Sequence, residues 1–114
     1  MDAFEVDELL AARRAAGGPW HEFLRVEALS AGVYVLAAGA TDPQAPHAED
    51  EVYVVLAGEA TITVGDRSRP VRAGSVVYVP AAVPHRFHDV TAELAVLVVF
   101  APAESEVDQG EGIG

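Results

Sequence analysis

Short apolar runs, separated by glycine, proline and acidic residues, follow one another along most of the chain. The first segment differs from the rest. Residues 7–19 begin with acidic residues, carry arginines towards the end and close on glycine and proline, which predicts one short helix. Asp7 is the expected N-cap. Leu9 and Leu10 are expected to face the remainder of the domain, so that the helix acts as a lid or brace.

The apolar runs after this helix have the length and composition of β-strands. Gly58 lies between two such runs and predicts a hairpin connection, and Gly65 with Asp66 predicts a second turn. Pro70 restricts its own run to a sheet edge, because proline lacks the N–H that a central ladder requires. Strands are expected at about 22–29, 32–38, 52–56, 60–64, 69–71, 75–79, 85–90 and 94–100.

Many short strands with closely spaced turns predict an all-β sandwich or barrel. The runs 33–36 and 94–100 are apolar at consecutive positions, so both of their faces require burial. This favours a homodimer, and a covering helix would serve the same purpose. The expected organisation is the helix and first strand in 1–29, the barrel in 30–101, and a mobile, acidic, glycine-rich tail in 102–114.

Composition narrows the classes of function. A chain of 114 residues with 51% hydrophobic and 22% charged residues suits one globular domain. The net charge of −11 argues against binding to nucleic acid or to an anionic membrane, since both need a basic surface. Cysteine and lysine are absent, which excludes disulfides, thiolate ligands and lysine Schiff bases. No targeting or spanning segment is evident, so a cytoplasmic location is expected.

The chemically informative residues surround two histidines. His47, Glu49 and Glu51 stand immediately before an apolar run, where carboxylates must be paired, hydrogen-bonded or bound to a metal. His85 follows two prolines that stiffen the backbone, as a metal ligand requires. Together, His47, Glu51 and His85 would form a set of two histidines and one carboxylate. Such a set suits one divalent Fe, Mn, Zn or Ni ion with positions left open for water or substrate.

The spacing of these residues resembles that of the cupin family over roughly residues 30 to 101. The first cupin motif runs Gly, five residues, His-x-His, three or four residues, Glu, six residues, Gly. The second runs Gly, five residues, Pro-x-Gly, two residues, His, three residues, Asn. The matching positions here are Gly39, Ala45, His47, Glu51 and Gly58 for the first motif, and Gly74, Pro80, Ala82, His85 and Asp89 for the second.

The resemblance implies a single cupin jelly-roll barrel of six to eight strands with a short N-terminal helix, and a metal held inside by His47, Glu51 and His85. Tyr53 and Phe87 each lie two residues from one of these ligands, so their side chains are expected to point into the barrel as well. They would either line a substrate pocket or pack in the core.

The sequence departs from the family pattern at three positions. Ala45 replaces the first histidine, whereas Ala82 replaces a glycine and Asp89 an asparagine, which are milder changes. The loss of one imidazole leaves three interpretations: a site with three ligands, a site that recruits a nearby oxygen, or a barrel without metal. Glu49 shares strand parity with the other ligands and is the first candidate recruit, and Gln44 is the second.

The remaining polar residues have simpler interpretations. His88 lies at an odd offset from the second ligand histidine, so it is expected to face away from the barrel interior. His21 is expected at the surface, in the linker after the helix. Asp42, Glu49 and Asp50 would form no more than a solvated acidic loop if they did not serve a metal.

The function that follows is a small metal-binding cupin that binds or acts on a small organic molecule in the barrel. As an enzyme it would be a dioxygenase, an isomerase or a decarboxylase, with Glu51 or Glu49 as the general base. The competing hypothesis is a non-enzymatic binding or sensing barrel, with or without metal. A third hypothesis is a structural barrel with a dead site. The fold does not choose among them.

Overall fold

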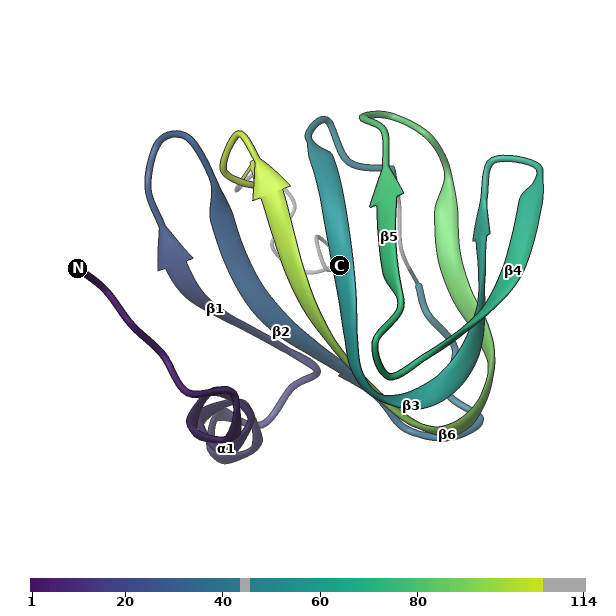
Figure 1. The fold of residues 1–114 in the computed structure, drawn as a ribbon, viewed down its shortest axis with the longest axis horizontal. Helices are drawn as coiled ribbons and strands as arrows, with labels where there is room; N and C mark the ends of the chain where they lie inside the picture. The colour runs from purple at the N-terminus through teal and green to yellow at the C-terminus, as the bar shows by residue number, and fades with distance from the viewer. Residues whose placement is uncertain (44–45, 106–114) are drawn as a thin grey trace.

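The computed structural model describes residues 1–43 and 46–105, and this part of the chain forms one helix followed by six strands (Figure 1). The helix α1 spans Val6–Ala16. The strands are β1 (Trp20–Arg25), β2 (Ser30–Leu36), β3 (Asp50–Val64), β4 (Arg67–Arg72), β5 (Val76–Val79) and β6 (His85–Ala101).

Helix α1 begins one residue before its expected N-cap. Glu5 holds the N-cap position without a side-chain capping bond, so Asp7 lies in the first turn, where its charge complements the helix dipole. Gly17 ends the helix as predicted, with a φ of 94° and its N–H donating to the carbonyl of Arg13. The helix packs against β1 and β2 and buries Leu9. No helix in the described ranges is both long and apolar enough to cross a membrane.

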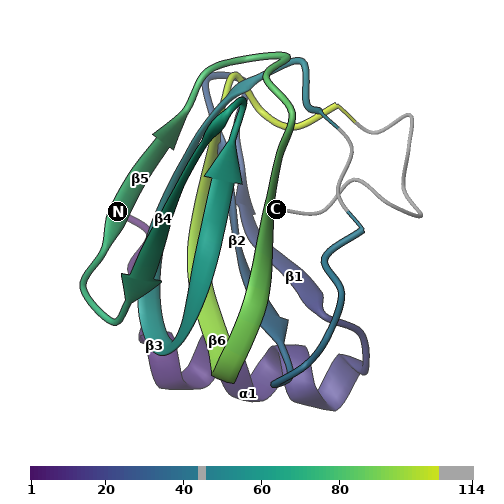
Figure 2. The same cartoon turned by 90° about the vertical axis from the view of Figure 1, so that its right-hand side faces the viewer.

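The strands form one antiparallel sheet that curls around an interior (Figures 1 and 2). Their order is β1-β2-β6-β3-β4, and β5 pairs with β3 as well. The first half of β3 pairs with the end of β6 and with β5, whereas its second half pairs with the start of β6 and with β4. The two long strands, β3 and β6, therefore run through both halves of the barrel. This is the jelly-roll architecture expected from the motifs.

The hairpin expected at Gly58 does not form. Strand β3 continues through this residue with shifts in register, and β6 likewise joins the two strands predicted at 85–90 and 94–100. Gly58 has a φ of 92°, and a Cβ at this position would lie 2.1 Å from the carbonyl oxygen of Glu93. The glycine is thus needed where β3 bends and β6 approaches its backbone closely.

The other turn and edge predictions are confirmed. Gly65 and Asp66 form the turn between β3 and β4, and Gly65 has a positive φ of 60°. Strand β4, which contains Pro70, stands at one end of the strand order. The core lies inside the curled sheet and consists mainly of alternate residues from β2, β3 and β6, the largest of which are Tyr34, Tyr53, Phe87, Phe100, Ile62 and Leu94.

The outer face of the sheet is covered unevenly. Val33 on β2 is fully buried, and α1 packs on this part of the sheet, so the covering helix anticipated for the apolar run 33–36 is present. On the other side of the barrel, Val76 and Tyr78 of β5 are 66% and 58% exposed. Leu97 on the outer side of β6 is only half-buried. The homodimer expected from this second apolar face stays a prediction.

Candidate metal centre

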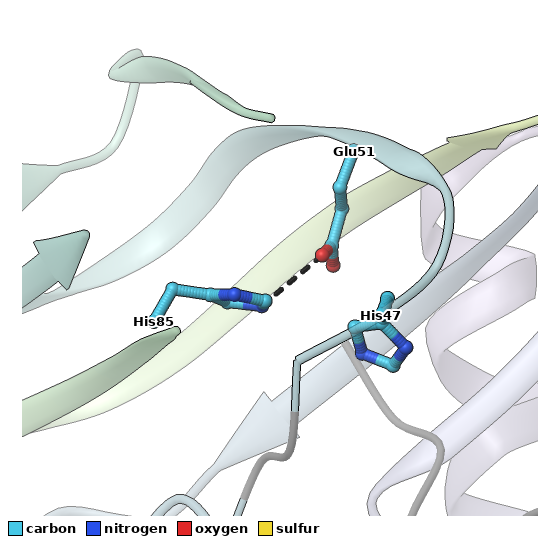
Figure 3. Close-up of side chains that lie close together, drawn as sticks. All are labelled: His47, Glu51 and His85. Atoms are coloured by element: carbon cyan, nitrogen blue, oxygen red, sulfur yellow. Dashed lines mark ion pairs between the residues drawn. The ribbon is translucent and has the colours of Figure 1, made fainter. Parts of the chain in front are cut away.

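Three side chains from separate parts of the fold converge inside the barrel (Figure 3). His47 precedes β3, Glu51 lies at the start of β3, and His85 is the first residue of β6. Each offers one ligand atom, and these atoms all lie within 4.8 Å of one another. The side chains of Glu51 and His85 are 1% exposed and that of His47 is 8% exposed. The structure therefore brings together the set predicted from the sequence.

The curl of the sheet explains how Glu51 and His85 meet. Glu51 pairs with Phe100 near the end of β6, whereas His85 pairs with Val64 at the far end of β3. The two residues are not neighbours in the ladder. Because β3 and β6 both bend, Glu51 near the start of β3 and His85 at the start of β6 face each other across the interior (Figure 3).

The loop before β6 is tied directly to the loop before β3. The N–H of Ala82 donates to the carbonyl of His47 at 2.7 Å, and the N–H of Ala81 donates to Oδ1 of Asp50 at 2.8 Å. Ala82 has a φ of 66° and Asp89 a φ of 52°. These are the positions where the second motif has glycine and asparagine, residues that adopt left-handed backbone readily. Both positions are therefore left-handed in this chain, although neither carries the residue of the motif.

The hydrogen bond of His85 fixes which ring nitrogen faces Glu51. Its Nδ1 lies 2.9 Å from the carbonyl oxygen of Val83, and a carbonyl only accepts, so Nδ1 carries a proton. In the neutral ring, Nε2 then presents a lone pair towards Oε1 of Glu51, 3.1 Å away. Neither carboxylate oxygen of Glu51 has a hydrogen-bond partner among the described residues. A protonated His85 forms an ion pair with Glu51 in this arrangement, whereas a neutral His85 requires a cation between the two groups.

This arrangement fits a divalent metal ion. Ligands at about 2.1 Å from an ion and at right angles to each other are about 3 Å apart, which matches the contact between His85 and Glu51. Nε2 of His47 is also buried without a hydrogen-bond partner in the described part of the chain. Imidazole and carboxylate are the donors that Fe, Mn, Zn and Ni accept, so the donor chemistry agrees with the predicted group of metals.

A fourth ionisable side chain, that of Glu104, lies near the set and was not expected from the sequence. Glu104 follows β6 in the segment predicted to be a mobile tail, yet it is only 7% exposed, and its Oε2 lies 3.5 Å from Nδ1 of His47. Burial, together with the negative charges of Glu51 and Glu49, raises the pKa of the Glu104 carboxyl from 4.5 to about 8. An acidic residue in an acidic, glycine-rich stretch carries no local signal of burial, so sequence reasoning missed it.

Neither Glu49 nor the pocket residues predicted from the sequence belong to the three-residue set. Glu49 is buried, but its Oε2 accepts the N–H of Ser105 at 3.1 Å. Gln44, like Ala45, lies outside the described residues. Tyr53 and Phe87 are fully buried and stack edge to face at 4.8 Å, so the structure places them in the core beside His85. Their role in binding substrate stays a prediction.

The other two histidines lie apart from the metal set. His88 is half-buried, with Nε2 at 2.7 Å from Oγ1 of Thr63 and Nδ1 at 2.9 Å from Oδ2 of Asp89. It therefore faces away from the interior, as its offset predicted. His21 does not lie in a linker but in β1, paired with Val33 and half-buried.

Asp42 is not part of a solvated loop. It is 4% exposed, its Oδ1 accepts a hydrogen bond from the hydroxyl of Tyr34, and its Oδ2 accepts one from the N–H of Phe87. Burial, the hydrogen bond and the charge of Asp42 together raise the pKa of Tyr34 far above its ordinary value. Asp42 thus fastens the loop before His47 to β2 and β6.

A separate groove of about 800 Å³ lies between β4 and the bend of β6. It contains none of the three convergent side chains, so it is not the opening to the metal set. The groove carries charges of both signs, from Arg69, Arg72, Glu59 and Asp89.

The sequence profile of the cupin domain family matches residues 32–101. An uncharacterized protein of Streptomyces coelicolor is 55% identical to this chain over 105 residues. That alignment covers 92% of this chain and 100% of the relative. The profile match includes His47, Glu51 and His85, so these motif positions fall within the matched region.

Solved structures show the same fold. An RmlC-like cupin from Methanocaldococcus jannaschii, with a double-stranded β-helix, superposes with a TM-score of 0.71 at 23% identity, covering 90% of this chain and 91% of that chain. The DMSP lyase DddQ from Ruegeria pomeroyi superposes with a TM-score of 0.63 at 30% identity. This second match covers 67% of the present chain and only 39% of the lyase, so the chain spans about two-fifths of that enzyme.

Proposed function

This chain belongs to the cupin family, and we propose that it is a metal-binding member whose divalent ion is held by His47, Glu51 and His85. One observation carries the proposal. His47, Glu51 and His85 place ligand atoms within 4.8 Å of one another inside the barrel, where the carboxylate oxygens of Glu51 have no hydrogen-bond partner within the described residues. Leaving such a carboxylate buried is costly without a compensating charge, and a divalent cation supplies that charge.

We further propose that the bound ion serves a small organic molecule with an oxygen donor, in an open coordination position. When bound, the ion would supply Lewis acidity to that oxygen. The chain's own residues would orient the ion and exclude water from it, since the three side chains are almost fully buried. Glu49 and Glu104 are acidic residues near the proposed ion site. They disfavour a small molecule that carries strong negative charge in addition to the group with which it binds the metal.

The test of metal binding is the metal content of protein purified without chelators or metal-affinity resin, measured by mass spectrometry. The wild-type protein is expected to carry near-stoichiometric metal, and His47→Ala and His85→Ala are expected to lose it. His88→Ala is the matched control, because this histidine binds Thr63 and Asp89 outside the set and should leave the metal content unchanged. Wild-type protein that takes up no metal even after reconstitution would refute the proposal.

Catalysis and simple binding are separated by a second experiment on the metal-loaded protein. Likeness to a lyase that acts on a small molecule supports an enzymatic role, although that likeness covers part of the enzyme only. Turnover of small oxygen-bearing substrates under aerobic conditions, lost in His85→Ala, is the result expected of an enzyme. Thermal stabilisation by a compound without turnover would instead identify a binding or sensing barrel.

We propose in addition that two copies associate through the exposed apolar side of β5. Val76 and Tyr78 lie on this strand opposite Val54 and Val52 of β3, which are themselves only half-buried. Replacing Val76 and Tyr78 together by serine is expected to reduce the mass measured by light scattering from that of a dimer to that of a monomer. A wild-type protein that is monomeric at all concentrations would contradict this.

A further inference from the structure

The segment after β6 returns to the barrel and is fastened on both sides of Glu104. The N–H of Glu104 donates to Oγ of Ser30 at 2.8 Å, and the N–H of Ser105 donates to Oε2 of Glu49 at 3.1 Å. Ser30 and Glu49 are both buried. In Figure 1 this stretch leaves the tip of β6 beside the connection from β1 to β2, where Ser30 begins β2. The position of the Glu104 backbone is therefore set by two hydrogen bonds that do not involve its own side chain.

The Glu104 side chain is directed at one nitrogen of His47. It is 8% exposed, and its Oε2 lies 3.5 Å from Nδ1 of the imidazole, with no hydrogen-bond partner in the described part of the chain. A buried carboxylate oxygen in this state is stabilised most by a donor that comes within hydrogen-bond distance. Nδ1–H of His47 is the group positioned to become that donor.

Such a contact would determine which nitrogen of His47 faces the metal. A neutral imidazole that donates from Nδ1 presents its lone pair at Nε2, and Nε2 of His47 is buried without a hydrogen-bond partner among the described residues. His85 is arranged in the same way, because its Nδ1 donates to the carbonyl of Val83 and its Nε2 faces Glu51. Both imidazoles would then bind the ion through Nε2, with an oxygen acceptor behind each ring.

We propose that Glu104 is a positioning residue of the metal centre, which holds the His47 ring through Nδ1 so that Nε2 faces the ion. The inference rests on the proposed metal site. Glu104 lies outside both cupin motifs, in the segment that follows the last strand of the barrel. In a chain where Ala45 replaces one motif histidine, fixing His47 in its metal-binding tautomer strengthens one of the three ligands that are left.

The experiment measures zinc affinity by competition with a chromophoric chelator. Glu104→Ala is expected to weaken zinc binding about 10- to 100-fold, the usual effect of removing a carboxylate behind a ligand histidine. Glu104→Gln keeps an oxygen that accepts from Nδ1–H, so it is expected to recover a large part of the loss. Both variants retain the backbone bonds to Ser30 and Glu49, and circular dichroism of the metal-free proteins checks that they fold.

Glu22→Gln is the matched control. It removes a negative charge that acts on the Glu104 carboxyl, and in the described part of the chain Glu22 pairs with Arg25 and not with His47. Its zinc affinity is expected to stay within about threefold of wild type, because the effect of Glu104 is a local contact and not a general field. An equal weakening in Glu22→Gln and Glu104→Ala would overturn the inference.

A spectroscopic readout distinguishes positioning from a merely structural role. In zinc-loaded wild-type protein, the Nδ1–H proton of His47 is expected to give a downfield NMR signal that is protected from exchange. The signal should be lost in Glu104→Ala and kept in Glu22→Gln. If the signal persisted in Glu104→Ala and the zinc affinity were unchanged, the role of Glu104 would be refuted. Loss of zinc binding in His85→Ala would show in the same experiment that the metal site itself is intact in the wild-type protein. Wild-type protein that bound no zinc or other divalent ion would instead refute the metal site itself, and this inference with it.

Discussion

The backbone N–H of Ala82 donates a hydrogen bond to the carbonyl oxygen of His47 over 2.7 Å. This bond joins the loop before β6 to the loop before β3, and these two segments deliver His85 and His47 to the candidate metal centre. The donor residue has a left-handed backbone, with a φ of 66°. The separation of the two histidines thus depends on a turn that an alanine adopts only with strain.

Replacing Ala82 by glycine is expected to stabilise the protein. A left-handed alanine costs about 1 to 2 kcal/mol, and the greater freedom of glycine in the unfolded chain offsets part of the gain, which leaves about 0.5 to 1 kcal/mol. Urea unfolding of Ala82→Gly measures this. Ala81→Gly is the control, because Ala81 is exposed and has no left-handed strain, so its substitution should give no stabilisation. Equal shifts in the two variants would contradict the explanation.

Gly58→Ala and Gly74→Ala separate steric clash from backbone strain. Both glycines are left-handed, with φ values of 92° and 96°, but only the Cβ at position 58 would meet Glu93 and Leu94. Gly74→Ala is expected to lower the free energy of unfolding by about 1 to 2 kcal/mol. Gly58→Ala is expected to cost about 3 kcal/mol or more, since clash adds to the strain. Chemical denaturation of the two variants should show this difference, and equal losses would disprove the close approach of β6.

Removal of the Asp42 side chain is expected to destabilise the fold strongly. Asp42→Ala leaves the hydroxyl of Tyr34 and the N–H of Phe87 buried without their acceptor, at about 1 to 3 kcal/mol for each group. Asp50→Ala is the comparison, because this exposed carboxylate accepts the N–H of Ala81 at the surface and its loss should cost less than about 1 kcal/mol. A loss of stability in Asp42→Ala no larger than in Asp50→Ala would show that the buried contacts contribute little.

The metal-free protein is expected to lose stability as pH rises through the range in which Glu104 titrates. The pKa of this carboxyl is about 8 in the folded protein and 4.5 in the reference state. Between these values the folded state binds a proton that the unfolded state has released, so the free energy of unfolding falls with increasing pH. The contribution is fully present below pH 4.5 and is lost by about pH 8.

The groups that set this shift, after burial itself, are the carboxylates of Glu51, Glu49 and Glu22, opposed by Arg25, and His47 is also in contact. Glu104→Gln does not titrate, so it should flatten the decline in stability between about pH 5 and 8. Thermal unfolding of metal-free wild-type and variant proteins across this range measures the difference. Parallel pH profiles for the two would show that other groups cause the decline.

The sequence by itself determined the fold class and the three convergent side chains. His47, Glu51 and His85 are recognisable because each sits at a fixed distance from glycines or prolines in its own segment, and such local spacing is a property of the sequence. The turn at Gly65 and the edge position of β4 follow for the same reason, since glycine and proline act on the backbone where they stand.

Only the tertiary structure decided what depends on segments far apart in the chain. The sequence around Gly58 predicts a turn, but Gly58 lies within the continuous strand β3. Glycine is needed there because the backbone of Glu93 in β6 approaches it closely. The acidic sequence around Glu104 predicts a solvated side chain. In the structure, backbone hydrogen bonds to Ser30 and Glu49 hold this segment beside His47, where the side chain is buried. Local patterns report backbone preference and polarity, whereas burial and bending arise from contacts between distant residues, which exist only once the sheet has closed.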